Sequence, residues 1–177
     1  SYPQKVLSPI LEAGSIINEL NQTIWDDGNK FFDPTSFQIS NIESGTGASN
    51  VVPGSLKMLF NFRFSPESTA ESLKDRFIKI LNKSKCEFEI EWTLNAKPYL
   101  TEKTDLLSIV QTALKKINGK EAEVNNGGGT SDGRWVAPSG AEVIELGPKN
   151  ATIHQIDEKI SLKDLDKLQE IYQQILI

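Results

Sequence analysis

The most constraining feature of this sequence is a run of alternating apolar residues in its first half. Every second residue from Leu56 to Phe64 is large and apolar, while the residues between them are mostly polar. Successive side chains of a β-strand point to opposite faces, so this spacing predicts a strand over residues 55–64 with one aromatic face against a core. Arg63 and Asn61 then lie on the opposite face of that strand.

The segments around this strand indicate an α+β unit. Apolar periodicity predicts a helix over residues 8–21, a strand around 37–42, a helix from 69 to about 83 and a strand over 88–94. Ser8 can cap the first helix, with Pro9 at its first position, and Ser68 with Glu71 has the spacing of a capping box for the second. The order helix, strand, strand, helix, strand is that of a ferredoxin-like βαββαβ unit without its first strand, so we expect a truncated chain.

A second unit is expected after Pro98, which interrupts the strand pattern. We therefore predict two domains, residues 1–98 and residues 99–177. The elements predicted for the second are a helix over 106–117 between Thr104 and Gly119, short strands at 121–124 and 142–146, and a last helix from Ser161 whose buried face carries Leu165, Leu168, Ile171, Tyr172 and Ile175.

Composition narrows the class of protein. The chain of 177 residues carries a net charge of −5 and lacks the basic stripe that binding to a phosphate backbone requires, so we expect no nucleic-acid partner. No apolar run approaches the roughly 20 residues that span a bilayer, so no membrane partner is expected either. Cys86 is the single cysteine, which fits a reducing cytoplasm.

Two loops in the second half are candidates for chemistry. Gly127–Gly129 has no Cβ atoms, so its backbone can approach a ligand closely and present amides to it, although a plain flexible turn has the same composition. His154, the only histidine, lies in a polar loop and is either a metal ligand or a structural residue. A serine hydrolase using Ser131, His154 and Asp157 is disfavoured, because the Gly-x-Ser-x-Gly turn is absent.

Two polar residues of the first half are also candidates. Arg63 has a planar fork of donors that suits a substrate carboxylate, and its alternative is a surface ion pair. Asn50 follows a Gly-Thr-Gly turn, where its amide either binds a carbonyl oxygen or caps the turn.

Three segments together resemble a known family. They are Trp25-Asp26-x-Gly28-Asn29, Gly127-Gly128-Gly129-Thr130-Ser131-Asp132-Gly133-Arg134, and the stretch from Gly147 to Glu158 that holds His154. They look like the carboxy-terminal half of the succinyl-diaminopimelate desuccinylases, two-zinc amidohydrolases of the M20 metallopeptidase family. The resemblance implies a ferredoxin-like dimerisation or lid domain over residues 1–98, followed by the carboxy-terminal portion of a zinc-peptidase-like catalytic domain over residues 99–177.

The resemblance also implies roles for individual residues. His154 matches a ligand of one zinc ion, and substrate-binding positions are matched by Asn50, Arg63, Gly129, Thr130 and Asn150. Asn50 is expected to act in the active site of the partner subunit of a homodimer formed through the lid. The catalytic base and most zinc ligands of the family have no counterpart here, so no catalytic residue is expected in this chain.

The implied reaction of the intact enzyme is hydrolysis of N-succinyl-LL-2,6-diaminopimelate to succinate and LL-diaminopimelate, in lysine and diaminopimelate biosynthesis. This chain alone is expected to be inactive and to bind no zinc, because a zinc site takes three or four ligands. The alternative is an autonomous dimerisation module without catalysis, which the ferredoxin-like half would suit.

Overall fold

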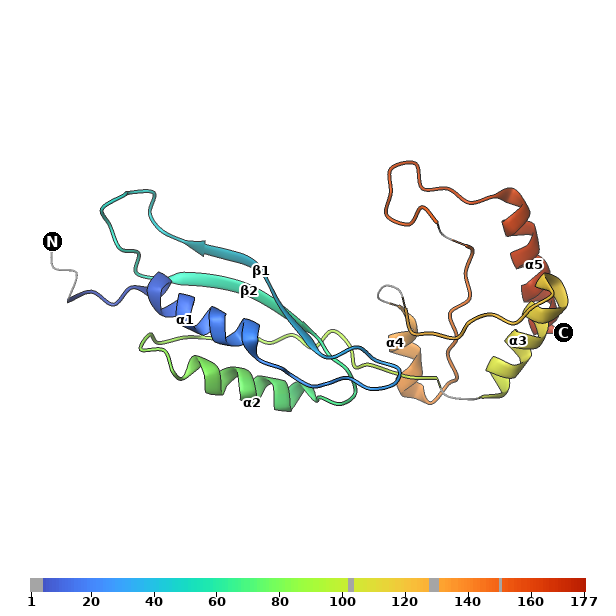
Figure 1. Ribbon diagram of the computed structural model, residues 1–177, viewed down its shortest axis with the longest axis horizontal. Helices are drawn as coiled ribbons and strands as arrows, with labels where there is room; N and C mark the ends of the chain where they lie inside the picture. Colours follow the sequence, from blue (N-terminus) through green and yellow to red (C-terminus); the bar gives the residue numbers. More distant parts are fainter. Residues whose placement is uncertain (1–4, 102–103, 128–130, 150) are drawn as a thin grey trace. The chain divides into compact units, whose positions relative to one another are not determined.

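A computed structural model describes residues 5–101, 104–127, 131–149 and 151–177. The chain divides into two compact units, Ser1–Pro98 and Tyr99–Ile177. Their elements are labelled in Figure 1, and each unit is described by itself. Within the described residues, no helix is both long enough and apolar enough to cross a membrane.

The first unit is a β-hairpin with two helices. Its elements are α1 (Pro9–Gln22), β1 (Ser36–Ser44), β2 (Leu56–Arg63) and α2 (Ala70–Leu81). The two strands are antiparallel, with Ser36 opposite Arg63 at one end and Ser44 opposite Leu56 at the other, and one bulge between Ile39 and Asn41. Each of these four elements was predicted from the sequence, with boundaries that differ by only a few residues.

The aromatic face of β2 forms the core of this unit. Exposure alternates along the strand as predicted, with Met58, Phe60 and Phe62 packed inward and Arg63 exposed. Phe60 stacks on the fully buried Phe77 of α2, with ring centroids 4.4 Å apart. Such ring pairs add about 1 kcal/mol each beyond the burial of their area. The sheet and α2 are therefore held together by aromatic packing.

The predicted strand over residues 88–94 is wrong. The structure has a two-stranded sheet, and residues 87–95 are assigned to no strand. Ile90 and Trp92 still pack against the core while Glu91 between them is exposed, but Phe88 and Leu94 are exposed, so the predicted core face is correct only in its middle. A strand also needs a hydrogen-bonding neighbour, and in a ferredoxin-like sheet the last strand pairs with the first. No strand precedes α1 among the described residues to provide that neighbour.

The capping box of α2 was assigned to the wrong pair. Thr69 is the N-cap, its side chain accepts from the amide of Ser72, and the Ser72 hydroxyl accepts from the amide of Thr69. Ser68 is buried one residue earlier, and its hydroxyl donates to Asp26 at 2.5 Å. The tertiary contact of Ser68 moves the start of the helix by one residue.

The carboxylate of Asp26 joins two loops at one end of the first unit, the connection from α1 to β1 and the connection from β2 to α2. It accepts hydrogen bonds from the amides of Gly28 (2.9 Å) and Thr35 (2.8 Å) and from the hydroxyls of Thr35 and Ser68. Thr35 in turn accepts from the amide of Ser65 at 3.0 Å. Burial acts to raise the pKa of Asp26, but these hydrogen bonds to the ionised form outweigh it and hold the pKa well below its ordinary value.

The second unit contains helices but no strand among its described residues. Its elements are α3 (Asp105–Asn118), α4 (Gly133–Val136), the 3-10 helix η2 (Ala137–Ser139) and α5 (Leu162–Leu176). Thr104 caps α3 by accepting from the amide of Leu107, and Gly119 ends it in the left-handed conformation, as predicted. α3 packs on α5 around a small core of Val110, Ala113, Leu114 and Ile171.

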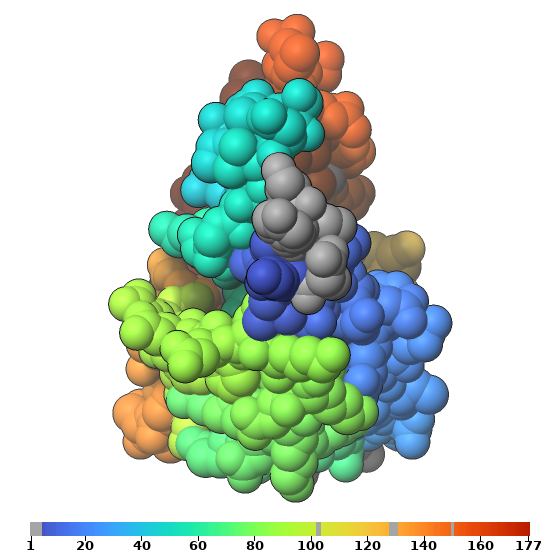
Figure 2. Space-filling view, turned by 90° about the vertical axis from the view of Figure 1, so that its left-hand side faces the viewer, coloured from blue at the N-terminus to red at the C-terminus, as the bar shows by residue number. Residues whose placement is uncertain are grey.

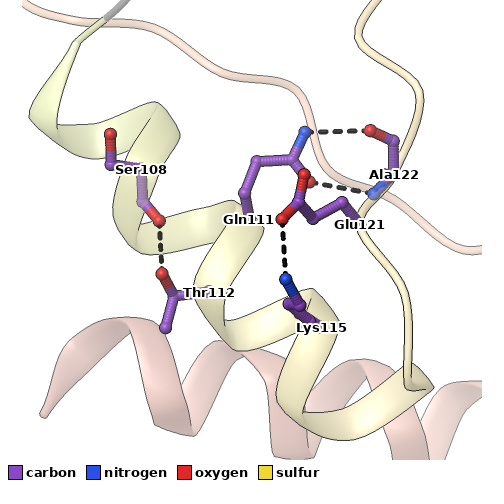
Figure 3. A network of polar contacts seen from close by, with 6 residues as sticks. All are labelled: Ser108, Gln111, Thr112, Lys115, Glu121 and Ala122. Atoms are coloured by element: carbon purple, nitrogen blue, oxygen red, sulfur yellow. Dashed lines mark hydrogen bonds and ion pairs between the residues drawn. The ribbon is translucent and has the colours of Figure 1, made fainter.

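Side chains replace the predicted strand pairing at residues 121–124. The side-chain amide of Gln111 accepts a hydrogen bond from the backbone N–H of Ala122 and donates one to the backbone carbonyl of Ala122, both at 2.9 Å (Figure 3). Lys115 forms an ion pair with Glu121 at 3.2 Å. The predicted strand at 142–146 is also absent, although Ile144 packs against the small core.

The buried face of α5 is narrower than its periodicity predicts. Ile171 is buried, and Leu168 and Ile175 are partly buried, whereas Leu165 and Tyr172 are exposed. In this unit α5 packs against α3, and a single helix can cover only part of an apolar stripe.

We expect Asp26→Ala to lower the free energy of unfolding by about 2–4 kcal/mol, because it leaves several buried donors without an acceptor. Asp27→Ala is the matched control, since Asp27 is exposed next to it. Urea unfolding followed by tryptophan fluorescence measures both. An equal loss from the two variants would contradict the role of Asp26.

The same experiment has a pH signature. The pKa of Asp26 is lower in the folded state than in the unfolded chain, so the folded protein binds fewer protons. Its contribution to stability is therefore present above pH of about 4 and lost as pH falls below it. Asp26→Ala should flatten the acid limb of the stability curve.

Candidate functional site

The two candidate residues of the first unit lie at opposite ends of the hairpin. Asn50 is exposed in the turn between β1 and β2, the loop that stands out in Figures 1 and 2 in cyan to green. Arg63 is the last residue of β2. The strand has eight residues at about 3.3 Å each, so roughly 25 Å separates its ends. The structure does not bring the two together within one chain.

Arg63 is exposed on the outer face of the hairpin, opposite the aromatic face. Its neighbour across the ladder is Ser36, which carries no charge. The Arg63 guanidinium makes no hydrogen bond or ion pair with another described residue. Its donors are therefore available to a carboxylate.

The candidates Gly129, Thr130 and Asn150 lie outside the described residues. Beside the glycine loop, Ser131 accepts from the amide of Gly133 at 2.8 Å, and the Tyr99 hydroxyl lies 3.2 Å from the Ser131 hydroxyl. A Cβ atom at residue 133 would lie 2.5 Å from the Tyr99 hydroxyl and 2.7 Å from a methyl of Val143, so a larger residue would have to displace both side chains. Residues 131–133 are thus held against two other segments of the second unit.

His154 lies exposed in the loop that precedes α5, drawn in orange in Figure 1. Its φ is 61°, and that of Asp157 is 62°; among the described residues these are the two non-glycine residues in the left-handed region. The loop is closed by Thr152, whose hydroxyl accepts from the amide of Lys159 at 3.0 Å and donates to its carbonyl at 3.1 Å.

The described residues fit one ligand of a metal ion and no complete metal centre. No three His, Cys, Asp or Glu side chains come together among them in a way that would hold a metal. His154 is one exposed imidazole, and a stable zinc site needs three or four donors. The hydrogen bonds of Ser131 go to Tyr99 and Gly133, so they give no support to the serine-hydrolase alternative.

Sequence reasoning missed the residues that hold these loops. Asp26 and Gly28 stood out only as part of a motif, yet Asp26 joins two loops and Gly28 has no space for a Cβ, which would lie 2.4 Å from the carbonyl oxygen of Phe32. No local sequence pattern indicates the hydrogen bonds of Tyr99 and Thr152, because their partners, Ser131 and Lys159, are 32 and 7 residues away. Asp-x-Gly is a common turn pattern that could have indicated the first pair.

Comparison with known proteins relates the first unit to a peptidase dimerisation domain and nearly the whole chain to desuccinylases. Residues 1–89 match the peptidase dimerisation domain of the M20 type. The chain is 53% identical over 176 residues to the succinyl-diaminopimelate desuccinylase of Acinetobacter baumannii strain AYE, 51% to that of Pseudoalteromonas atlantica and 48% to that of Methylococcus capsulatus. Each match covers 99% of this chain and 47% of the relative, so the chain spans about half the length of the curated relatives it matches.

Solved structures share the fold. Aminopeptidase PepT from Bacillus cereus matches with a TM-score of 0.79 at 22% identity, over 98% of this chain and 46% of that one. The M20 family metallo-carboxypeptidase Sso-CP2 from Sulfolobus solfataricus matches with a TM-score of 0.66 at 16% identity, over 99% of this chain and 53% of that one.

We expect the 177-residue chain to show no saturable zinc uptake at micromolar zinc, because one imidazole is one ligand. Isothermal titration of the chain and of His154→Ala should give the same weak heats. Tight uptake of one or two zinc ions per chain, lost in His154→Ala, would contradict this.

Proposed function

Because the chain belongs to the M20 family of peptidase dimerisation domains, we propose that it is part of a desuccinylase that hydrolyses N-succinyl-LL-2,6-diaminopimelate to succinate and LL-diaminopimelate. The observation that carries the proposal is the 53% identity to a desuccinylase, which extends over 99% of the chain and so includes both units. Within it, residues 1–98 are the lid and dimerisation domain, and residues 99–177 are part of the catalytic domain.

In this proposal the chain binds and orients the substrate. Arg63 grips a substrate carboxylate with two parallel hydrogen bonds, which its exposed and unpaired guanidinium supports. Gly129, Thr130 and Asn150 hold the succinyl group, and Asn50 donates to a carbonyl oxygen. The group that activates water is not among these residues, so the chain alone is inactive.

Zinc is part of the proposal, with His154 as one ligand and the other ligands outside this chain. When bound, zinc supplies a Lewis acid that polarises the amide carbonyl and lowers the pKa of a bound water. The exposure of His154 on a loop leaves its imidazole accessible to such an ion. A cytoplasmic location also belongs to the proposal and rests on the single cysteine.

The proposed enzyme is a homodimer formed through residues 1–98. The match to a dimerisation domain over residues 1–89 supports this assembly. The roughly 25 Å between the ends of β2 supports a role for Asn50 in the partner's site, because one chain does not bring Asn50 close to Arg63. A shared site then follows from two-fold symmetry, in which each subunit lends the same residue to the other.

A hybrid enzyme tests the proposed function. This chain replaces the matching 176 residues of the Acinetobacter baumannii desuccinylase. We expect the hybrid to release succinate from N-succinyl-LL-2,6-diaminopimelate and to sediment as a dimer, with the unmodified enzyme as the control. A folded, dimeric hybrid without activity would favour the dimerisation module over the enzyme.

Arg63→Lys in the active hybrid tests the carboxylate contact. Lysine keeps the charge and loses the planar fork, so we expect kcat/KM to fall by about tenfold or more. Lys57→Arg is the matched control, because Lys57 is exposed on the same face of β2. Unchanged kinetics in Arg63→Lys would leave Arg63 as an ordinary surface residue.

A further inference from the structure

The loop that contains His154 has an uncommon backbone conformation, with positive φ at two non-glycine residues. The left-handed conformation is sterically disfavoured for residues that carry a Cβ, and this loop contains two of them, His154 and Asp157. Such conformations persist where the surrounding contacts determine them. The hydrogen bonds of the loop therefore identify what fixes the backbone conformation at His154.

Those contacts converge on Thr152. Its carbonyl accepts from the amide of Gln155 at 3.0 Å, which forms the turn on which His154 lies. Its hydroxyl both accepts from the amide of Lys159 and donates to the carbonyl of Lys159, at 3.0 and 3.1 Å. The Thr152 side chain thus pairs with both backbone polar groups of Lys159, and these two hydrogen bonds join the two ends of the loop.

We propose that Thr152 is the positioning residue for His154: its hydroxyl closes the loop over residues 152–159 and so orders the imidazole in the direction in which it binds zinc. This inference rests on the proposed function, since it gives the ordered imidazole its ligand role. Thr152 itself touches neither metal nor substrate. It acts by reducing the conformational freedom that the His154 loop would lose on binding.

The chemistry of threonine makes a clean test possible. Thr152→Val keeps the shape of the side chain and removes both hydroxyl bonds, whereas Thr152→Ser keeps the hydroxyl. Thr112→Val is the matched control in the same unit, because the Thr112 hydroxyl donates to a helix carbonyl, that of Ser108, at 2.8 Å (Figure 3).

The first measurement uses the 177-residue chain. His154 is its only histidine, so its imidazole gives one unambiguous set of NMR signals. In Thr152→Val we expect the Lys159 amide to exchange at least about tenfold faster and the His154 backbone to lose order, with the thermal midpoint of the chain little changed. Thr152→Ser and Thr112→Val should keep the wild-type exchange and order. Unchanged exchange and order in Thr152→Val would overturn the proposal.

The second measurement uses the hybrid enzyme and separates this proposal from the proposed function. We expect Thr152→Val to weaken zinc binding by about tenfold, as residues that orient metal ligands do, with KM unchanged and Thr152→Ser as the rescue. His154→Ala should weaken zinc binding more. If His154→Ala weakens it and Thr152→Val does not, the positioning role is wrong while the ligand role stands. If His154→Ala has no effect, both are wrong.

Discussion

The carboxylate of Asp26 is the interaction on which the first unit depends most. It lies between α1 and β1, and through its hydrogen bonds to Thr35 and Ser68, and through Thr35 to Ser65, it holds together the start of β1, the end of β2 and the start of α2. Arg76 of α2 adds a second tie, since it donates to the backbone carbonyl of Trp25 and lies over the Trp25 ring. A single half-buried carboxylate can satisfy several loop donors at once, which water would otherwise have to do.

This arrangement gives each named residue of the Trp25-Asp26-x-Gly28-Asn29 motif a structural role. Trp25 is buried in the aromatic core, Asp26 gathers the loops, and Gly28 has a positive φ with no room for a side chain. Asn29 accepts from the amides of Phe31 and Phe32 and so completes the turn. A motif that identifies the family by resemblance therefore has a structural role here, and it holds the end of the hairpin at which Arg63 lies.

The second unit is held by side chains that bond to the backbone of other segments. Gln111 holds Ala122, Tyr172 donates to the carbonyl of Leu146 at 2.5 Å, and Thr152 closes the loop of His154. Each of these satisfies polar backbone groups that a sheet would otherwise pair. In the described part of this unit they take the place of strand ladders, and the bonds of Thr152 close the loop that bears His154.

The sequence by itself determined the elements whose signals are local. The alternation over residues 55–64, Pro9 at the start of α1, and Thr104 and Gly119 at the ends of α3 were all readable, because periodicity and capping involve residues only a few positions apart. The tertiary structure alone decided which extended segments are strands, since residues 87–95 alternate in sequence but have no strand beside them among the described residues. It also decided that the Ser68 hydroxyl bonds to Asp26 and does not cap α2, and that Thr152 closes the loop of His154. The physical reason is the same in each case: a hydrogen bond needs a partner, and the position of a distant partner in the sequence is fixed only when the chain has folded.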